Sequence, residues 1–150
     1  MRTVGTTVAL SGSAKSGIRW KRVVIAAFLS ELAVMAVLGA IIVPYMFLIA
    51  PGQTSAAYDE FGQNAGYYAA APAAALATFF IAYLAVRKLD SAVIANGVMV
   101  GVVEVLLTLG FIFGARPGDR PMYVVSFVLR IAAGYAAGAL AQRKRQRGLT

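Results

Sequence analysis

Four strongly polar side chains stand out within otherwise apolar segments of the sequence: Glu31, Asn96, Glu104 and Arg130. A charged side chain at the centre of a bilayer costs roughly 2.5 to 3.5 kcal/mol on insertion scales unless it meets a partner or water. The chemistry open to these residues is therefore the pairing of charge inside a membrane. They are the candidate functional site of the chain.

Glu104 and Arg130 are expected at nearly the same depth. At about 1.5 Å of helix rise per residue, Glu104 lies roughly 20 Å from the inner start of its segment and Arg130 roughly 17 Å from the inner end of its own. Small and polar residues recur beside each charge at helical spacing, which places them on the same helix face. These residues are Gly97, Gly101 and Thr108 on the first segment, and Ser126, Gly134 and Gly138 on the second.

The two faces fit each other as an antiparallel hairpin, in which facing residues have a constant index sum. The sum is 234 or 235 for Gly97 with Gly138, Gly101 with Gly134, Glu104 with Arg130, and Thr108 with Ser126. Glycines four residues apart let two helix backbones approach closely. We therefore predict a Glu104–Arg130 ion pair flanked by Thr108 and Ser126. Its favoured role is structural, to lock the hairpin, and its functional alternative is a charged gate or a coupling site.

Glu31 adds a third charge at a similar depth. It follows Arg22 by nine positions in the sequence, which places it roughly 13 Å into the hydrocarbon core. Three charges cannot neutralise one another as pairs. Either Glu31 joins a carboxylate–Arg–carboxylate cluster in which one carboxyl keeps its proton, or it faces a water-filled cavity or another protein. The structural alternative is a protonated Glu31 that is hydrogen-bonded to Ser30 or to a neighbouring helix.

The composition disfavours most soluble and catalytic classes. Hydrophobic residues make up 60% of the 150 positions and charged residues only 13%, far from the balance of soluble domains. The sequence contains no cysteine and no histidine. Disulfides, thiol nucleophiles, imidazole acid–base chemistry and the histidine or cysteine ligands of zinc and haem are therefore excluded. We expect no enzyme activity, no metal and no cofactor.

Four apolar segments are long enough to cross a bilayer as α-helices. They lie at about 23–50, 66–86, 92–114 and 121–141. The pattern predicts an all-α membrane protein with four transmembrane helices in an up-down-up-down bundle. Pro44 predicts a bend in the first helix, and Asp90 and Ser91 are placed to cap the third.

The transmembrane domain is expected to span residues 19–142, between a flexible tail at 1–18 and a basic tail at 143–150. Most lysines and arginines gather beside one end of the helices, whereas Arg116 and Arg120 lie at the other. By the positive-inside rule, this asymmetry predicts that both termini are cytoplasmic. We expect a multi-pass protein of a cell membrane, with the bacterial inner membrane as the favoured location. The basic edges suit anionic lipid headgroups rather than nucleic acid.

Two functions from different classes fit this interior. The first is a helix-packing accessory or partner-binding subunit, in a homo-oligomer or with another membrane subunit, in which Glu31 pairs across the contact. The alternative is an oligomeric small transporter or channel. It would move protons, cations or a small cationic solute along a path formed by Glu31, Asn96 and the Glu104–Arg130 pair.

Overall fold

The computed structural model describes residues 17–115 and 117–148, and this part of the chain folds into helices joined by short connections. The elements are α1 (Trp20–Pro44), its π-helical continuation η1 (Tyr45–Ile49), α2 (Ser55–Val86), α3 (Val93–Gly114) and α4 (Arg120–Arg147). With η1 counted as part of α1, these are four helices, each long and apolar enough to cross a membrane. The chain thus has the build of a multi-pass membrane protein. Arg116 and nearly all of the predicted tail at 1–18 lie outside the described residues.

The first helix changes type at Pro44 instead of ending there. Proline has no backbone N–H, so it cannot continue the regular hydrogen-bond ladder. The next residues form η1, and at its end Ala50 N donates to Tyr45 O at 2.9 Å, a bond across five residues. At the position where the sequence predicts a bend, the structure therefore has a π-helical turn.

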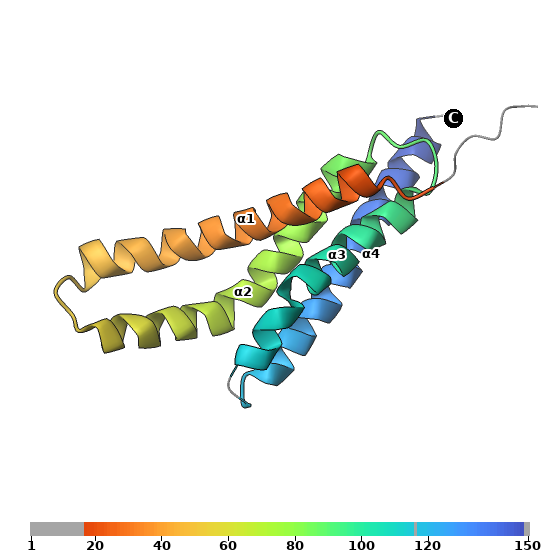
Figure 1. Cartoon of the computed structure of the whole chain (residues 1–150). Coiled ribbons are helices and arrows are strands. Elements are labelled where there is room, and N and C mark those ends of the chain that lie inside the picture. Colours follow the sequence, from red (N-terminus) through yellow and green to blue (C-terminus); the bar gives the residue numbers. More distant parts are fainter. Residues whose placement is uncertain (1–16, 116, 149–150) are drawn as a thin grey trace, which may run out of the picture.

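The second helix begins at Ser55, well before the predicted start at residue 66. Thr54 is its N-cap, and the Thr54 Oγ1 accepts a bond from Ala57 N at 3.4 Å. The Tyr58 hydroxyl donates to Ala50 O at 2.8 Å and accepts from Gln53 N at 3.0 Å, which holds the short α1–α2 connection against the helix. The expected outer loop is therefore mostly helix, because polar residues in that stretch still form helix once they are capped. Figure 1 shows α2 changing direction near its middle, where Pro72 lies within the helix.

Two boundaries at the other end also differ from expectation. Asp90 and Ser91 do not cap α3, because the N-cap is Ala92, which has a left-handed backbone (φ 52°) and provides no side-chain bond. Asp90 instead lies 3.3 Å from Arg145 Nη2. The fourth helix continues to Arg147, so most of the predicted basic tail at 143–150 is helical. Lysine and arginine are good helix formers and are favoured at the negative end of the helix dipole.

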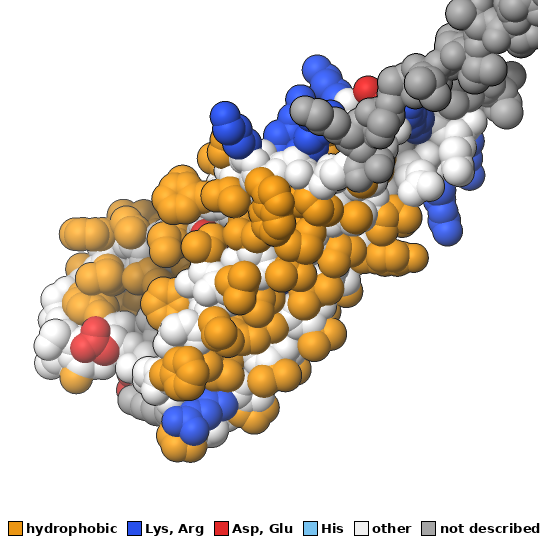
Figure 2. All heavy atoms as spheres, turned by 45° about the vertical axis from the view of Figure 1, so that its right-hand side comes forward, with side chains coloured by type: hydrophobic (Ala, Val, Ile, Leu, Met, Phe, Trp, Pro, Cys, Tyr) orange, Lys and Arg blue, Asp and Glu red, His pale blue; other side chains and the backbone are white. Residues whose placement is uncertain are grey.

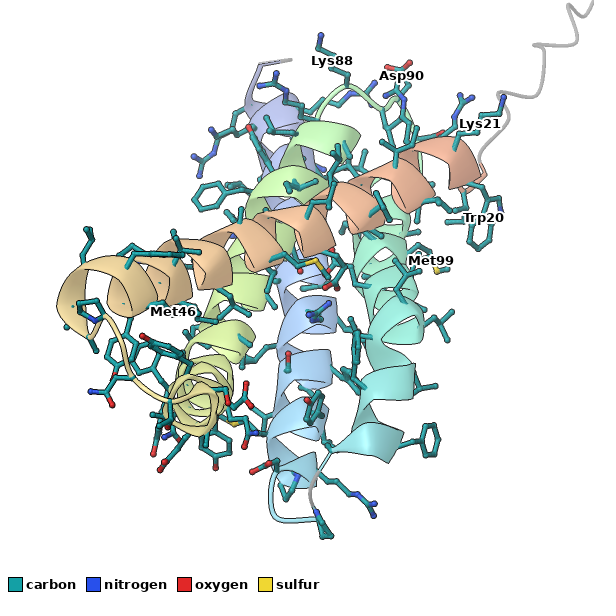
Figure 3. All side chains as sticks on the ribbon, turned by 60° about the vertical axis from the view of Figure 1, so that its left-hand side comes forward. Trp20, Lys21, Met46, Lys88, Asp90 and Met99 are labelled. Atoms are coloured by element: carbon teal, nitrogen blue, oxygen red, sulfur yellow. The ribbon has the colours of Figure 1, made fainter. Side chains whose placement is uncertain are left out.

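The helices form two hairpins, α1–α2 and α3–α4, that pack together at one end of the molecule and diverge toward the other (Figure 1). The closed end carries both described chain ends and most of the lysines and arginines, and we call it the basic end (Figure 2). Figure 3 places Lys21 and Lys88 there and Met46 at the far end of the first hairpin. Hydrophobic side chains cover the middle of the surface (Figure 2).

Small residues fill the core near the basic end, where all four helices meet. This core consists of Val23, Ala26, Ala27, Ala82, Val100 and Ala137. Because these side chains are short, the helices approach closely at this level. Beyond this core the two hairpins diverge (Figure 1).

Candidate functional site

Arg130 lies between two carboxylates inside the bundle. Arg130 belongs to α4. Its Nη1 donates a hydrogen bond to Oε1 of Glu31 on α1, and its Nη2 donates to Glu31 Oε2 at 3.4 Å. The same Nη1 lies 3.7 Å from Glu104 Oε2 on α3, within ion-pair range but without a hydrogen bond. The three side chains therefore form the carboxylate–Arg–carboxylate cluster that was one of the open alternatives for Glu31. Glu31, rather than Glu104, makes the closer contact with the guanidinium. We call these three residues the Arg130 cluster.

The glycine faces of α3 and α4 bring Glu104 and Arg130 together. A Cβ added to Gly101 would lie 2.6 Å from Arg130 O, so the α4 backbone at Arg130 rests directly on α3 within one turn of Glu104. A Cβ on Gly97 would overlap Gly134 O and lie 3.2 Å from Gly138 Cα. The two glycine faces meet as expected, and Gly97 contacts Gly138, but the closest contacts, Gly97 with Gly134 and Gly101 with Arg130, have an index sum of 231. The observed register is therefore shifted by about one helical turn from the expected sum of 234 or 235.

Glu104 is completely buried and meets a hydroxyl that sequence reasoning did not single out. Thr78 Oγ1, on α2, is hydrogen-bonded to Glu104 Oε2 and also lies 2.7 Å from Ala74 O. Ser30 of α1, equally buried, lies beside the same carboxyl. The sequence does contain one indication of this contact. Thr78 is as many residues away from Arg87, at the basic end of α2, as Glu31 is from Arg22, at the basic end of α1. Equal distance from the basic end means equal depth.

Three buried polar atoms of this region have no hydrogen-bond partner among the described residues: Ser30 Oγ, Glu104 Oε1 and Arg130 Nε. Native structures leave few such atoms, because each one costs the free energy of its lost hydration. The cluster therefore retains hydrogen-bonding capacity that the protein itself does not use.

The remaining predicted site residues divide into two groups. Thr108 donates to Glu104 O at 2.8 Å, and it lines a cleft together with Ser126, so both stay near the cluster. Asn96 does not join them. Its Oδ1 accepts from Arg19 N at 2.7 Å and its Nδ2 donates to Ala92 O at 2.8 Å, so it fastens the start of α1 to α3 near the basic end.

A cleft of about 800 Å³ opens where the two hairpins diverge. Glu31 and Arg130 line it beside Thr108 and Ser126, and Asp59 and Asp119 contribute from its far end. Its walls are mainly apolar and include aromatic residues: Tyr58, Tyr67, Phe111, Tyr123 and Phe127. The volume lies within the range of small-molecule sites, which typically combine apolar walls with a few polar groups.

The charges around the cleft are unequal. Among the described residues that line it, three carry carboxylates, Glu31, Asp59 and Asp119, and one carries a guanidinium, Arg130. A concave site with low-dielectric walls concentrates the field of its charges. These described lining residues therefore give the cleft an excess of negative charge.

No protein-family model matches the chain, and no curated protein or solved structure is similar enough to it to count as a match. Among the described residues, no group of acidic side chains is arranged to hold a metal ion. The function is therefore inferred from the chemistry of the Arg130 cluster and the cleft.

Proposed function

We propose that this chain is a membrane transport protein that admits a small cationic solute or a proton to the Arg130 cluster through the cleft. The supporting observation is that the Arg130–Glu31 ion pair, although largely buried, lines the cleft. Ionisable side chains that face a cavity within membrane segments are typical of ion and substrate paths. Glu31 is the proposed binding carboxylate, and Arg130 and Glu104 set its charge.

The proposed orientation places the cleft on the outer side of the membrane. Lysine and arginine favour the cytoplasmic side, so the basic end belongs there and both termini are cytoplasmic. Asp59 and Asp119 then lie near the outer mouth, where they raise the local concentration of cations.

The closed basic end supports a transport cycle with alternating access. The small-residue core and the Asn96–Arg19 hydrogen bond join α1 to the other helices on that side. A cleft that reaches the middle of the bundle from one side only is the arrangement that such a cycle requires of one of its states.

We favour transport over the accessory role because the small-residue faces of the helices are buried in contacts within the chain. Gly97, Gly101, Gly134 and Gly138 pack in the α3–α4 interface. Ala71, Ala74 and Ala82 of α2 are also buried against neighbouring helices. The main argument for a partner subunit was that small-residue faces allow close helix packing. In this structure these faces pack against helices of the same chain, so they need no partner subunit. We propose no catalytic role.

Flux in proteoliposomes tests the proposal. We expect the protein to carry protons, followed with a trapped pH-sensitive dye, or labelled methylammonium or rubidium, at rates above protein-free vesicles. Glu31→Gln should reduce this flux at least about tenfold, the equivalent of roughly 1.4 kcal/mol. Glu60→Gln is the matched control, because Glu60 is exposed and does not line the cleft.

The opposite outcome is equally specific. If the parent protein carries none of these probes, and a membrane partner copurifies with it but not with Glu31→Gln, the transport proposal is overturned in favour of the accessory role.

A further inference from the structure

We infer that the solute is an organic monocation with an aromatic body, which binds Glu31 in exchange for Arg130 and thereby releases a proton from Glu104. This inference rests on the proposed function and names both its substrate class and its coupling. An Arg130–Glu31 ion pair alone does not explain two features of the site. These are the second carboxyl, that of Glu104, and the large apolar cleft.

The walls of the cleft identify the body of the solute. Inorganic cations need several oxygen ligands to replace their water, whereas the walls of the cleft are mainly apolar and include five aromatic residues. The faces of such rings attract organic cations through their quadrupoles. Met35, Met46 and Met122 add flexible, polarisable side chains that adapt to varied apolar shapes. An aromatic cation would therefore be matched in both charge and shape.

The Arg130 guanidinium is placed to change partners. Its Nη1 bonds to Glu31 and already lies 3.7 Å from Glu104 Oε2. A shift of the side chain by about 1 Å would bring that nitrogen to ordinary hydrogen-bond distance from Glu104. Glu31, which lines the cleft, is then free to bind a cation from the cleft, while Arg130 remains paired.

The hydrogen bonds of Thr78 support a proton on Glu104 before the exchange. A threonine hydroxyl has one proton, yet Thr78 Oγ1 is within bonding distance of two oxygens, Ala74 O and Glu104 Oε2. Both contacts are satisfied when the Glu104 carboxyl donates to Thr78 and Thr78 donates to Ala74 O. The cluster then contains one carboxylate, one guanidinium and one neutral carboxyl, and it carries no net charge.

The exchange balances in charge and in protons. Before binding, Glu31 is ionised and paired with Arg130, and Glu104 is protonated. After binding, Glu31 is paired with the organic cation, Arg130 is paired with ionised Glu104, and one proton has left for the cleft. The groups that face Glu104 are Arg130 from α4, Thr78 from α2 and Ser30 from α1, with Glu31 beyond the guanidinium. Of these, only Glu31 and Arg130 carry charge.

Tetraphenylphosphonium is the probe, because it is an aromatic cation that has no titratable group. We expect purified parent protein to bind it at least about tenfold more tightly than tetraphenylborate, an anion of the same shape, a difference of roughly 1.4 kcal/mol. In weakly buffered solution, binding should release about one proton per bound ligand. The affinity of the parent should accordingly rise up to about tenfold for each pH unit, as linkage requires.

Variants separate the two parts of the inference. Glu31→Gln should weaken binding at least about tenfold, and Glu104→Gln should abolish proton release because no proton is left to displace. Glu60→Gln should behave like the parent. Equal binding of the two probes would overturn the assignment of a cation. Binding without proton release, and without pH dependence in the parent, would overturn the exchange.

Failure of this inference differs from failure of the proposed function. If tetraphenylphosphonium does not bind, while methylammonium, rubidium or proton flux persists and depends on Glu31, the substrate class is wrong and the transport function stands. If there is neither binding nor flux, both are wrong.

Discussion

Gly97 of α3 and Gly134 of α4 are in backbone contact, since a Cβ added to either residue would overlap the carbonyl oxygen of the other. This contact sets the distance between the two helices one turn to either side. Arg130 lies one turn from Gly134, and Glu104 lies one turn from Gly101, which rests on the Arg130 backbone, so the geometry of the charge cluster depends on contacts of residues without side chains.

Replacing either glycine should therefore destabilise the hairpin. We expect Gly97→Ala and Gly134→Ala each to lower the free energy of unfolding by at least about 1 to 3 kcal/mol, the usual cost of overpacking, because backbone cannot move aside as a flexible side chain can. Unfolding of purified protein in mixed micelles measures this. Gly110→Ala is the control, since nothing lies within 4 Å of the Cβ it would add. It should be neutral or stabilising by up to about 1 kcal/mol. Equal effects at Gly97 and Gly110 would contradict the close contact.

Replacing Arg130 alone should lower the free energy of unfolding more than replacing Arg130 together with one of its carboxylate partners. Arg130→Leu leaves Glu31 and Glu104 without their cation, and breaking a buried pair in this way typically costs about 3 to 5 kcal/mol. The double variant Glu31→Leu/Arg130→Leu should recover part of that loss, and more of it than Glu104→Leu/Arg130→Leu. Within the described part of the chain, the Arg130 side chain is hydrogen-bonded only to Glu31. Double-mutant cycles measure the two coupling energies.

An exposed ion pair provides the comparison for this cycle. Asp90 lies 3.3 Å from Arg145 in a largely exposed setting, where ion pairs contribute little. Asp90→Asn should leave unfolding unchanged within error. A coupling of Arg130 to Glu104 that exceeds its coupling to Glu31 would count against the observed pairing.

Asn96 should matter for α1 rather than for the charge cluster. Its Oδ1 accepts the Arg19 backbone N–H at 2.7 Å, just before α1 begins. Asn96→Ala removes this acceptor, and we expect faster hydrogen exchange of the first turn of α1, with a loss of stability of about 1 to 3 kcal/mol. The exposed Asn64 offers a matched control, Asn64→Ala, with unchanged exchange. Exchange that is faster near Arg130 instead of in α1 would show that Asn96 belongs to the cluster after all.

The orientation in the membrane is directly testable because the sequence has no cysteine. Gln53→Cys and Gln146→Cys place one thiol at each end of the molecule, both at exposed positions. In intact cells, a membrane-impermeant maleimide should label Gln53→Cys at once and Gln146→Cys only after permeabilisation. The reverse pattern would place the basic end outside, against the positive-inside rule.

The α3–α4 hairpin was largely predictable because two periodic constraints act on it. A helical period fixes which residues share a face, and antiparallel pairing then fixes which residues meet. Gly97 and Gly138 therefore meet as expected. The position of α1 around the bundle has no comparable constraint. The expected depth in the membrane predicted that Glu31 lies near Arg130. No sequence pattern indicated that Glu31, rather than Glu104, would be the closer partner of Arg130.

The cleft and the helix ends could not be read from hydropathy. Hydropathy marks where a helix enters lipid, and Ser55 to Ala65 continue α2 beyond that point. The cleft arises because the two hairpins separate, and α2 changes direction near Pro72 where they do so (Figure 1). Hydropathy does not report such a change of direction. Thr78 was overlooked because a single hydroxyl in an apolar segment can bond its own backbone at little cost. Its contact with Glu104 exists only in the folded bundle.

The Arg130 cluster has a consequence for biosynthesis. On insertion scales, Arg130 alone costs its segment roughly 2.5 to 3.5 kcal/mol at mid-membrane. The segments that contain Glu31 and Glu104 are synthesised before it, so both acidic partners precede the arginine at the translocon. Pairing with these earlier segments offsets that cost, so we expect truncation or reordering of the chain to lower the efficiency with which the last segment inserts.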